Sequence, residues 1–188
     1  MKRKIDRNFY KKEIIVGITG SIAAYKACDL VHALKKCGAN VNVIITENGK
    51  RFITPLSLQY LSGGRVYDDF FEIGTWSDKH IGLAERADII VVAPASADFI
   101  ARVALGRASD LLSATLLTTR SRVIIVPAMN SNMFTHQLTQ ANLERLRSTG
   151  YKILGPQKGD LACGEEGIGR MFDVTGIVDY LRKCLSAK

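Results

Sequence analysis

The chain has 188 residues, of which 47% are hydrophobic and 23% charged, and its formal net charge is +8. This length suits one compact domain, and the apolar fraction excludes wholesale disorder. Residues 1–12 hold six basic residues and one acidic residue, whereas the rest of the chain holds 20 basic and 17 acidic residues. We therefore interpret residues 1–12 as a mobile basic tail and residues 13–188 as one domain, and we expect no nucleic-acid partner.

The cysteines are scattered along the chain, at Cys28, Cys37, Cys163 and Cys184, without a CxxC pair. This spacing predicts neither a disulfide framework nor a metal site, and it favours a reducing, cytoplasmic environment. No apolar run reaches the roughly 20 residues that cross a bilayer, and the N-terminus lacks the pattern of a signal peptide. We therefore expect no membrane association.

Hydrophobic runs and turn residues predict strands that alternate with helices. In chain order we expect a strand at 14–16, a helix at 22–37, a strand at 41–45, a helix near 51–61, an edge strand within 65–71, a helix at 80–85 and a strand at 87–93 that Pro94 ends. Next we expect helices at 97–105 and 110–118, a strand at 123–126, a helix at 137–148, a weak strand at 152–154, a glycine-rich loop at 155–169 and a helix at 176–185. Continuous apolar strands separated by helices are typical of a parallel sheet covered on both faces. The expected fold class is α/β, a doubly wound, Rossmann-like parallel sheet in a single domain.

Ligands of such folds bind beyond the carboxyl ends of the strands, so the turns there are the informative places. In the turn Gly17-x-x-Gly20-Ser21, backbone N–H groups and the helix dipole favour an anion, although a tight turn that needs glycine explains the pattern equally well. The turn is neither G-x-G-x-x-G nor a P-loop. Thr46 stands where a dinucleotide site has an acid, so a mononucleotide fits better, although Glu47, one residue later, keeps NAD from being excluded.

Two further turns follow buried strands. The small residues of Pro94-Ala95-Ser96-Ala97 let the backbone approach a ring closely. In residues 127–134, Asn130 is either a turn former or an amide placed to bond a carboxylate or carbonyl. The neighbouring Met129, Met133 and Phe134 form either an apolar wall around a flat ligand or part of the core.

Residues 159–171 combine glycines with Cys163 and Arg170 in a stretch too polar for the core. We interpret it as a mobile flap over a site, with a plain surface loop as the alternative. Arg170 is suited to clamp a phosphate or a carboxylate. Among the histidines, His80 is the candidate for catalysis, whereas His32 and His136 are expected to be ordinary, partly exposed residues.

Together these segments resemble the flavin-dependent cysteine decarboxylases, from about residue 13 to residue 185. The shared motifs are Gly17-Ile18-Thr19-Gly20-Ser21-Ile22-Ala23-Ala24-Tyr25-Lys26, His80-Ile81-x-Leu83, the Pro-Ala-Ser-Ala turn at 94–97, Pro127-x-Met129-Asn130-x-x-Met133, and Ala162-Cys163-Gly164 to Gly167-x-Gly169-Arg170-Met171. The last two motifs are specific, and the first is shared more widely. Two departures are visible: Phe134 stands where many members have Trp, and Asp98-Phe99 replaces the commoner Asn-Thr.

The resemblance implies a flavodoxin-like sheet that binds FMN at subunit contacts in trimers, which assemble into dodecamers in bacterial members. It assigns the cofactor to Gly20, Ser21, Ile22, Thr46, Glu47, Asn48, Ser96, Ala97, Asp98, Phe99 and Ala128. It assigns catalytic roles to His80, Asn130 and Cys163. It assigns substrate contacts to Asn130, Ala162, Cys163, Arg170 and Met171.

The implied reaction is decarboxylation of 4′-phospho-N-pantothenoyl-cysteine to 4′-phosphopantetheine in coenzyme A biosynthesis. The substrate thiol is oxidised to a thioaldehyde, CO₂ leaves to give an enethiol, and the enethiol is reduced again with a proton from Cys163. The alternatives are a peptidyl-cysteine decarboxylase, a flavin prenyltransferase of the same fold, and a phosphatase-regulating binding subunit. The cysteine-bearing flap argues against the first, and the Asn130 motif and the Cys163 loop argue against the second. The retained His80, Asn130 and Cys163, and the lack of a long acidic tail, argue against the third. Because 188 residues leave no room for a fused synthetase domain, we expect a free-standing decarboxylase, with a separate phosphopantothenoylcysteine synthetase as a possible partner.

Overall fold

The computed structural model describes residues 6–68, 79–160, 164 and 166–186. Its central feature is a parallel sheet whose strands are β1 (Glu13–Ile18), β2 (Asn40–Ile45), β3 (Val66–Tyr67), β4 (Ile89–Ala95), β5 (Arg122–Pro127) and β6 (Lys152–Ile153). Within these residues the strand order is β3-β2-β1-β4-β5-β6, and every neighbouring pair is parallel. Without the two-residue edge strand β3, this is the flavodoxin order, in which the second strand lies outside the first. The predicted α/β, doubly wound fold is therefore confirmed.

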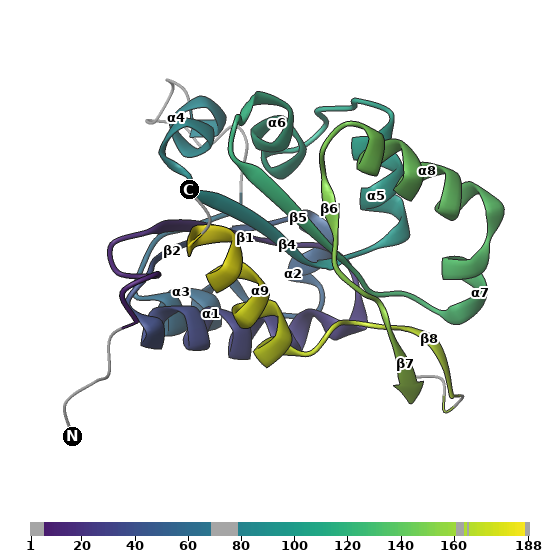
Figure 1. Cartoon of the computed structure of the whole chain (residues 1–188), viewed down its shortest axis with the longest axis horizontal. Helices are drawn as coiled ribbons and strands as arrows, with labels where there is room; N and C mark the ends of the chain where they lie inside the picture. Colours follow the sequence, from purple (N-terminus) through teal and green to yellow (C-terminus); the bar gives the residue numbers. More distant parts are fainter. Residues whose placement is uncertain (1–5, 69–78, 161–163, 165, 187–188) are drawn as a thin grey trace.

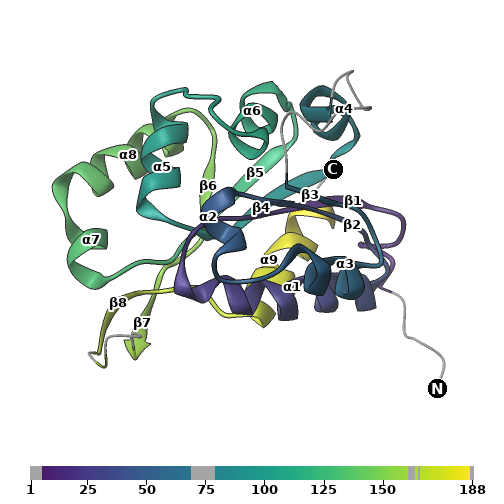
Figure 2. The same cartoon turned by 180° about the vertical axis from the view of Figure 1, so that it is seen from behind.

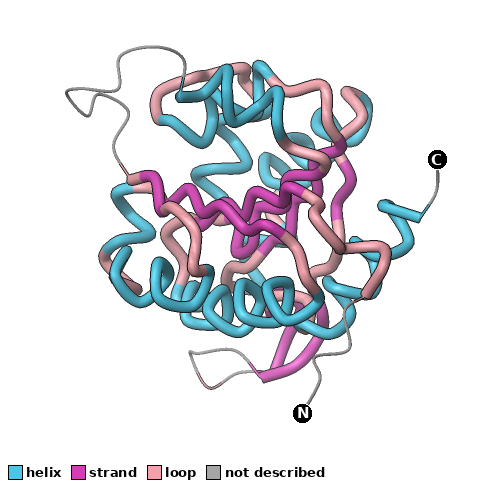
Figure 3. The backbone as a smooth tube through the Cα atoms, turned by 90° about the vertical axis from the view of Figure 1, so that its left-hand side faces the viewer, coloured by secondary structure: helices cyan, strands magenta, loops and turns pink. Residues whose placement is uncertain are grey.

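Helices cover both faces of the sheet (Figures 1 and 2). They are η1 (Ile22–Ala24), α1 (Tyr25–Cys37), α2 (Glu47–Lys50), α3 (Pro55–Ser62), α4 (Lys79–Arg86), α5 (Ala97–Ala104), α6 (Leu111–Thr118), α7 (Ser131–Thr135), α8 (Gln137–Ser148) and α9 (Val174–Ser186). One face carries α1, α3 and α9, and the other carries α4, α5, α6 and α8. Figure 3 shows the strands as a layer between these two sets of helices.

Alternating side chains of each strand pack toward opposite faces, which explains the two layers of helices. Ile14, Val16 and Ile18 belong to the core cluster under α1 and α9, and Ile15 belongs to the cluster under α5 and α6. At Gly17 an added Cβ would lie 2.6 Å from a methyl carbon of Leu112. Glycine at this position therefore lets α6 approach the sheet closely.

Several helices start where the chain leaves a strand, so their N-termini gather at the carboxyl edge of the sheet. The chain leaves β1 toward the α1 face and leaves β4 toward the α5 face, and these strands are neighbours. This is the switch point of a doubly wound sheet, where a crevice between the diverging turns is expected.

Some elements differ from the sequence prediction for identifiable reasons. Pro94 does not end its strand, because its carbonyl still accepts from the Thr19 N–H and the Ala95 carbonyl accepts from the Ala128 N–H. The helix expected near 51–61 is α3, which starts only at Pro55 because Thr54 caps it, and the short helix α2 before it, capped by Thr46, was not predicted. The short helix α7 was not predicted.

The glycine-rich loop expected at 155–169 is largely an antiparallel hairpin in the described residues, formed by β7 (Gln157–Asp160) and β8 (Glu166–Arg170). Gly169 explains where this hairpin lies. The φ of Gly169 is +147°, and an added Cβ would lie 2.2 Å from the Met129 carbonyl oxygen. Only glycine therefore lets β8 lie directly against the turn that follows β5.

The interpretation of residues 1–12 as a mobile tail is wrong for residues 6–12. Phe9 is fully buried in the core cluster under α1. Asp6 accepts from the Arg182 guanidinium at 2.6 Å, and the Asp6 N–H donates to the Cys37 carbonyl. Residues 1–5 of the predicted tail lie outside the described residues.

Cys28, Cys37 and Cys184 form no disulfide in the described part of the chain. In the same part, every helix is too short or too polar to cross a bilayer.

Candidate functional site

Side chains that cap helices line the carboxyl edge of the sheet. The Ser21 Oγ accepts from the Ala23 N–H and caps η1, and the Ser96 Oγ accepts from the Phe99 N–H and caps α5, each at 3.3 Å. The Asn130 Oδ1 accepts from the Asn132 N–H at 2.8 Å and caps α7. The partial positive charge at these helix starts, above all at the longer α5, therefore faces the same crevice.

Buried hydroxyl groups tie the three turns to one another. The Thr19 Oγ1 donates to the Pro94 carbonyl and accepts from the Ser96 N–H, both at 2.8 Å. The Ser21 Oγ donates to the Ala128 carbonyl at 3.2 Å. The turns after β1, β4 and β5 are thus joined by hydrogen bonds across the switch point.

These turns enclose a cavity of about 570 Å³. It is lined by Gly20, Ser21, Ile22, Ala23, Tyr25, Lys26, Phe52, Ser96, Ala97, Ala128, Met129, Asn130, Met133, Asp160, Gly169, Arg170 and Met171. A second cavity of about 410 Å³ is lined by Gly20, Asn48, Arg51, Phe52, Ser96, Ala97, Asp98 and Met133. The two adjoin, because they share residues from the turns after β1 and β4 and the side chains of Phe52 and Met133.

Two cations, Lys26 and Arg170, face the first cavity. Burial, and then the nearby Arg170 guanidinium, lower the pKa of Lys26 below its usual 10.5. No acidic side chain of the described residues forms an ion pair with Arg170. A bound anion would relieve the repulsion between the two cations, so this wall of the cavity is suited to a phosphate or a carboxylate.

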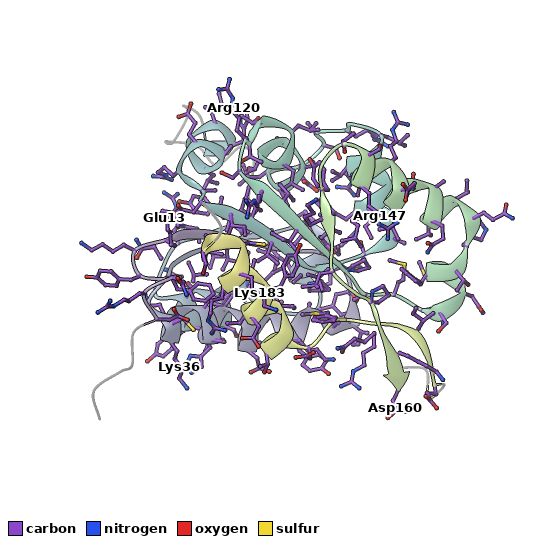
Figure 4. All side chains as sticks on the ribbon, viewed as in Figure 1. Glu13, Lys36, Arg120, Arg147, Asp160 and Lys183 are labelled. Atoms are coloured by element: carbon purple, nitrogen blue, oxygen red, sulfur yellow. The ribbon has the colours of Figure 1, made fainter. Side chains whose placement is uncertain are left out.

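The β7–β8 hairpin is fixed to the turn that carries Asn130. The Met129 N–H donates to the Gly169 carbonyl at 3.0 Å, and the Ser131 Oγ donates to the Ile168 carbonyl at 2.7 Å. Asp160 lies at the end of β7, and Figure 4 shows it on the opposite side of the molecule from Glu13 and Lys36. The hairpin therefore forms a wall of the cavity that extends beyond the edge of the sheet.

Most of the predicted site residues that the structure describes lie at these cavities. The first cavity is lined by Gly20, Ser21, Ile22, Ser96, Ala97, Ala128, Asn130, Arg170 and Met171 from the predicted set. The second is lined by Asn48 and Asp98 in addition. The structure thus brings together residues from five separate segments of the chain, and their individual roles stay predictions.

Three of the predicted cofactor residues lie at neither cavity. The Thr46 hydroxyl is occupied by backbone, since it accepts from the Gly49 N–H and donates to the Ile18 carbonyl. Glu47 is exposed and pairs with Lys50 at 2.6 Å. Phe99 is buried in the core, because the helical period of α5 turns it toward the sheet.

The predicted catalytic residues are not all at the cavity of their own chain. His80 lies on α4, and neither cavity includes it among its lining residues. Figures 1 and 2 show α4 at the opposite end of the sheet from α7 and the hairpin. Ala162 and Cys163 lie outside the described residues. Of the expected apolar wall, Met129 and Met133 line the first cavity, whereas Phe134 packs against the core.

Sequence reasoning assigned no role to Lys26, Arg51 or Phe52, which line the cavities. A signal was available for Lys26, because it lies in the first turn of the helix that follows the Gly20-Ser21 turn. Arg51 and Phe52 gave no comparable signal, because they follow a short helix that the hydrophobic pattern did not reveal.

The comparison with protein families decides the class of protein. The family model named Flavoprotein matches residues 2–186. The chain belongs to the flavoprotein family. This membership confirms the prediction of a flavin cofactor and covers nearly the whole chain.

Sequence relatives are consistent with this family. Over 169 residues, 89% of this chain, the sequence is 48% identical to the "Coenzyme A biosynthesis bifunctional protein CoaBC" of Escherichia coli strain K12. The alignment covers 42% of that protein, so the chain spans less than half the length of this relative.

Solved structures of the family share the fold. A mutant of PPC decarboxylase complexed with pantothenoylaminoethenethiol superposes with a TM-score of 0.87 at 28% identity, covering 94% of this chain and 100% of that one. The FMN binding protein AtHal3 superposes with a TM-score of 0.84 at 29% identity, covering 95% of this chain and 98% of that one.

Proposed function

We propose that this chain is an FMN-dependent phosphopantothenoylcysteine decarboxylase, which converts 4′-phospho-N-pantothenoyl-cysteine to 4′-phosphopantetheine in coenzyme A biosynthesis. The observation that carries the proposal is the position of Asn130, at the wall of the cavity and beside the hairpin whose strands flank Cys163 in the sequence. The likeness to PPC decarboxylase along the whole length of that chain supports the same substrate class.

The two cavities fit the chemistry of FMN. The apolar side chains of Phe52, Met129 and Met133 are suited to a flat ring, and the start of α5 at Ser96, which lines both cavities, is suited to a phosphate. At Gly20 an added Cβ would lie 2.6 Å from the Cβ of Asn48, so the backbone there can form the wall of the site directly. When bound, FMN would supply the reversible two-electron redox chemistry that side chains lack.

Asn130 is placed to hold the substrate carboxylate. Asn130 lines the first cavity, and its Oδ1 caps α7 by accepting from the Asn132 N–H. Its side chain is an uncharged amide, a type of group that can donate an N–H to a ligand oxygen. A neutral amide donor orients a carboxylate without the strong stabilisation that a cation would give to that charge. CO₂ loss is then easier than from an arginine-bound carboxylate, because the charge leaves the carboxylate in the transition state.

Lys26 and Arg170 are placed to bind the phosphate of the substrate. Both line the first cavity on the same wall as Asp160 and the hairpin. A phosphate dianion between them would raise the lowered pKa of Lys26 toward its ordinary value, so phosphorylated substrate would be favoured over its unphosphorylated form.

Cys163 lies in the sequence between β7 and β8, and we assign it the proton transfer that completes reduction of the enethiol. Its position along the chain supports this role, because β8 is hydrogen-bonded to the turn that carries Asn130. A cysteine thiol has the chemistry to supply the proton that this reduction needs.

His80 is assigned to the proton of the substrate thiol in a site completed by a second copy of the chain. The support is that His80 lies on α4, away from the cavity of its own chain. A homo-oligomer, as a trimer or a dodecamer of trimers, would place α4 of one copy at the cavity of the next. The cytoplasmic location and a separate synthetase partner stay predictions.

A visible spectrum and a turnover assay test the proposed function. The purified chain should be yellow, bind FMN, and release CO₂ from 4′-phospho-N-pantothenoyl-cysteine. Cys163→Ser should still release CO₂ but accumulate the oxidised enethiol, because only the late proton transfer is lost. A chain that binds no FMN, or that prefers a peptide ending in cysteine or a prenyl donor, would contradict the proposal.

Mixing two inactive variants tests the shared site. His80→Asn and Asn130→Asp each remove one member of the site, so each alone should have little activity. If His80 of one copy serves the cavity of another, dissociating and reassembling the two variants together should restore part of the activity, since some sites then contain both native residues. No recovery, or a monomeric mass in solution, would contradict this arrangement.

A further inference from the structure

Lys50 and Arg51 are neighbouring cations at the end of α2 with opposite surroundings. Lys50 pairs with Glu47 at 2.6 Å and Asp68 at 3.5 Å, and hydrogen bonding to Glu47, the largest cause, raises its pKa. Arg51 pairs with no acidic side chain in the part of the chain that the structure describes. Arg51 lines the second cavity, and Lys50 lines neither. Of these two neighbours, Arg51 alone therefore presents to a cavity a cation that has no carboxylate partner among the described residues.

The second cavity carries other polar groups beside this charge. Gly20, Asn48 and Ser96 form its walls, and Ser96 caps α5. The acidic residue that faces this cavity is Asp98, which pairs with the Arg102 guanidinium at 2.7 Å. Arg102 also pairs with Asp110, the capping residue of α6, so its single positive charge offsets that of Asp98 only in part. The cavity thus combines the Arg51 guanidinium and the start of α5 with one partly offset carboxylate.

We propose that Arg51 binds the phosphate group of FMN and makes the chain select FMN over riboflavin. The proposal rests on the proposed FMN site and adds to it a residue that faces the phosphate. A guanidinium offers paired N–H donors that match two phosphate oxygens, which explains why an arginine, and not a hydroxyl alone, is useful at this wall.

The two cavities share Phe52 and Met133 and differ in the residues that each adds to the shared ones. The larger cavity carries the apolar side chains of Ile22, Met129 and Met171, which do not line the second one, so the ring belongs there. The smaller cavity adds only Asn48, Arg51 and Asp98 to the shared residues, and all three are polar. The phosphate therefore belongs in the smaller cavity, and the ribityl chain crosses the shared boundary at Gly20 and Ser96.

Lys26 and Arg170 are the competing cations. They lie in the first cavity with Asn130 and the hairpin, on the side assigned to the substrate. If they held the cofactor phosphate instead, removal of Lys26, and not of Arg51, would abolish the preference for FMN.

Binding of FMN and riboflavin to the full chain, stripped of flavin, tests the proposal through quenching of flavin fluorescence. Arg51→Ala should weaken FMN binding by about tenfold, equivalent to about 1.4 kcal/mol, and should leave riboflavin binding within about twofold. Arg51→Lys should lie between the two, because it keeps the charge and loses the paired donors. Lys50→Ala is the matched control, since it removes the adjacent cation outside the cavity, and it should leave the affinity for both flavins unchanged.

Two results would overturn the inference while leaving the proposed function intact. One is an Arg51→Ala variant that binds FMN as tightly as the unmodified chain. The other is a Lys26→Ala variant that loses the preference for FMN while Arg51→Ala keeps it. If the unmodified chain bound neither flavin, the proposed function would fail and the inference with it. Circular dichroism of each variant checks that the fold is retained.

Discussion

The two ends of the sheet use their charged and polar side chains differently. At the amino end these groups pair with one another: Lys12 with Asp88 at 2.7 Å, and Glu13 with the Asn40 amide at 2.7 Å. At the carboxyl end, Arg51 and Arg170 face cavities without a carboxylate partner among the described residues. Figure 4 shows Glu13 and Lys36 on one side of the molecule and Asp160 on the other.

This difference separates stability from binding. A charge that already has a partner inside the protein contributes to the folded state and has little left to offer a ligand. A charge without a protein partner is a cost in the empty protein and gains when an anion binds. The pKa of Lys26 is lowered first by burial and then by the nearby Arg170 guanidinium, in agreement with this. Changes at the amino end should therefore alter the free energy of unfolding, and changes at the carboxyl end should alter ligand binding and turnover.

The largest expected effect is at the amino end. Phe9→Ala should lower the free energy of unfolding by about 3–5 kcal/mol, because it empties a fully buried aromatic position. Urea denaturation measures this loss, and the affinity of the remaining folded protein for FMN should not change. Tyr10→Ala is the matched control. The side chain of Tyr10, next to Phe9 in the sequence, is 51% exposed, so its removal should lower the free energy of unfolding much less. An equal loss from both variants would show that the N-terminal segment is not anchored through Phe9.

At the carboxyl end, Asn130→Asp should lower kcat/KM by about a hundredfold or more, because a carboxylate would then face the substrate carboxylate. Stability should change little, since an aspartate can cap α7 through the same Asn132 N–H. The control is Asn132→Asp, which adds the same charge to α7 at a position that does not line the cavity. A similar loss of turnover in both variants would point to a general field effect in place of a direct contact.

The smallest expected effect is pH-dependent and returns to the amino end. The hydrogen bond from Arg182 is the main cause that holds the pKa of Asp6 below its usual 3.8. Because the folded-state pKa is the lower one, the ion pair stabilises the protein above pH 3.8, and this contribution is lost as the pH falls through the lowered pKa. Asp6→Asn should cost about 0.5–1 kcal/mol at neutral pH, and thermal melts of the two proteins should converge in acid. A difference that persists unchanged in acid would rule out the ion pair as its source.

The sequence was sufficient for the order of the elements, because the buried parallel strands are long apolar runs and helices of ordinary length separate them. It failed where long-range contacts decide the local structure. Pro94 stays in its strand because groups distant in the sequence donate hydrogen bonds there: Thr19 to the Pro94 carbonyl and the Ala128 N–H to the Ala95 carbonyl. The β7–β8 hairpin forms from polar residues, and its contact with the turn after β5 depends on the space at Gly169.

For the site, the small-residue turns at the strand ends were the reliable signal, since the topology brings them together. Side-chain direction was not predictable. Phe99 follows Asp98 directly, yet the helical period turns Phe99 into the core while Asp98 faces the second cavity. Arg51 was missed because it differs from Lys50 in having no carboxylate partner among the described residues and in lining a cavity. Both properties depend on the folded structure and cannot be read from the sequence.

The hydroxyl of Thr19, which bridges the Pro94 carbonyl and the Ser96 N–H, has a consequence for the thermodynamics of binding. It sets the spacing of the first two turns through protein contacts alone, so a ligand does not have to order them on arrival. The entropy loss that usually accompanies closure of a loop around a ligand is then largely absent at this part of the crevice. The affinity for a cofactor in this part of the crevice then depends on contacts that the protein has already positioned. Any entropy loss on binding should fall mainly on the side proposed for the substrate, where the hairpin extends beyond the sheet.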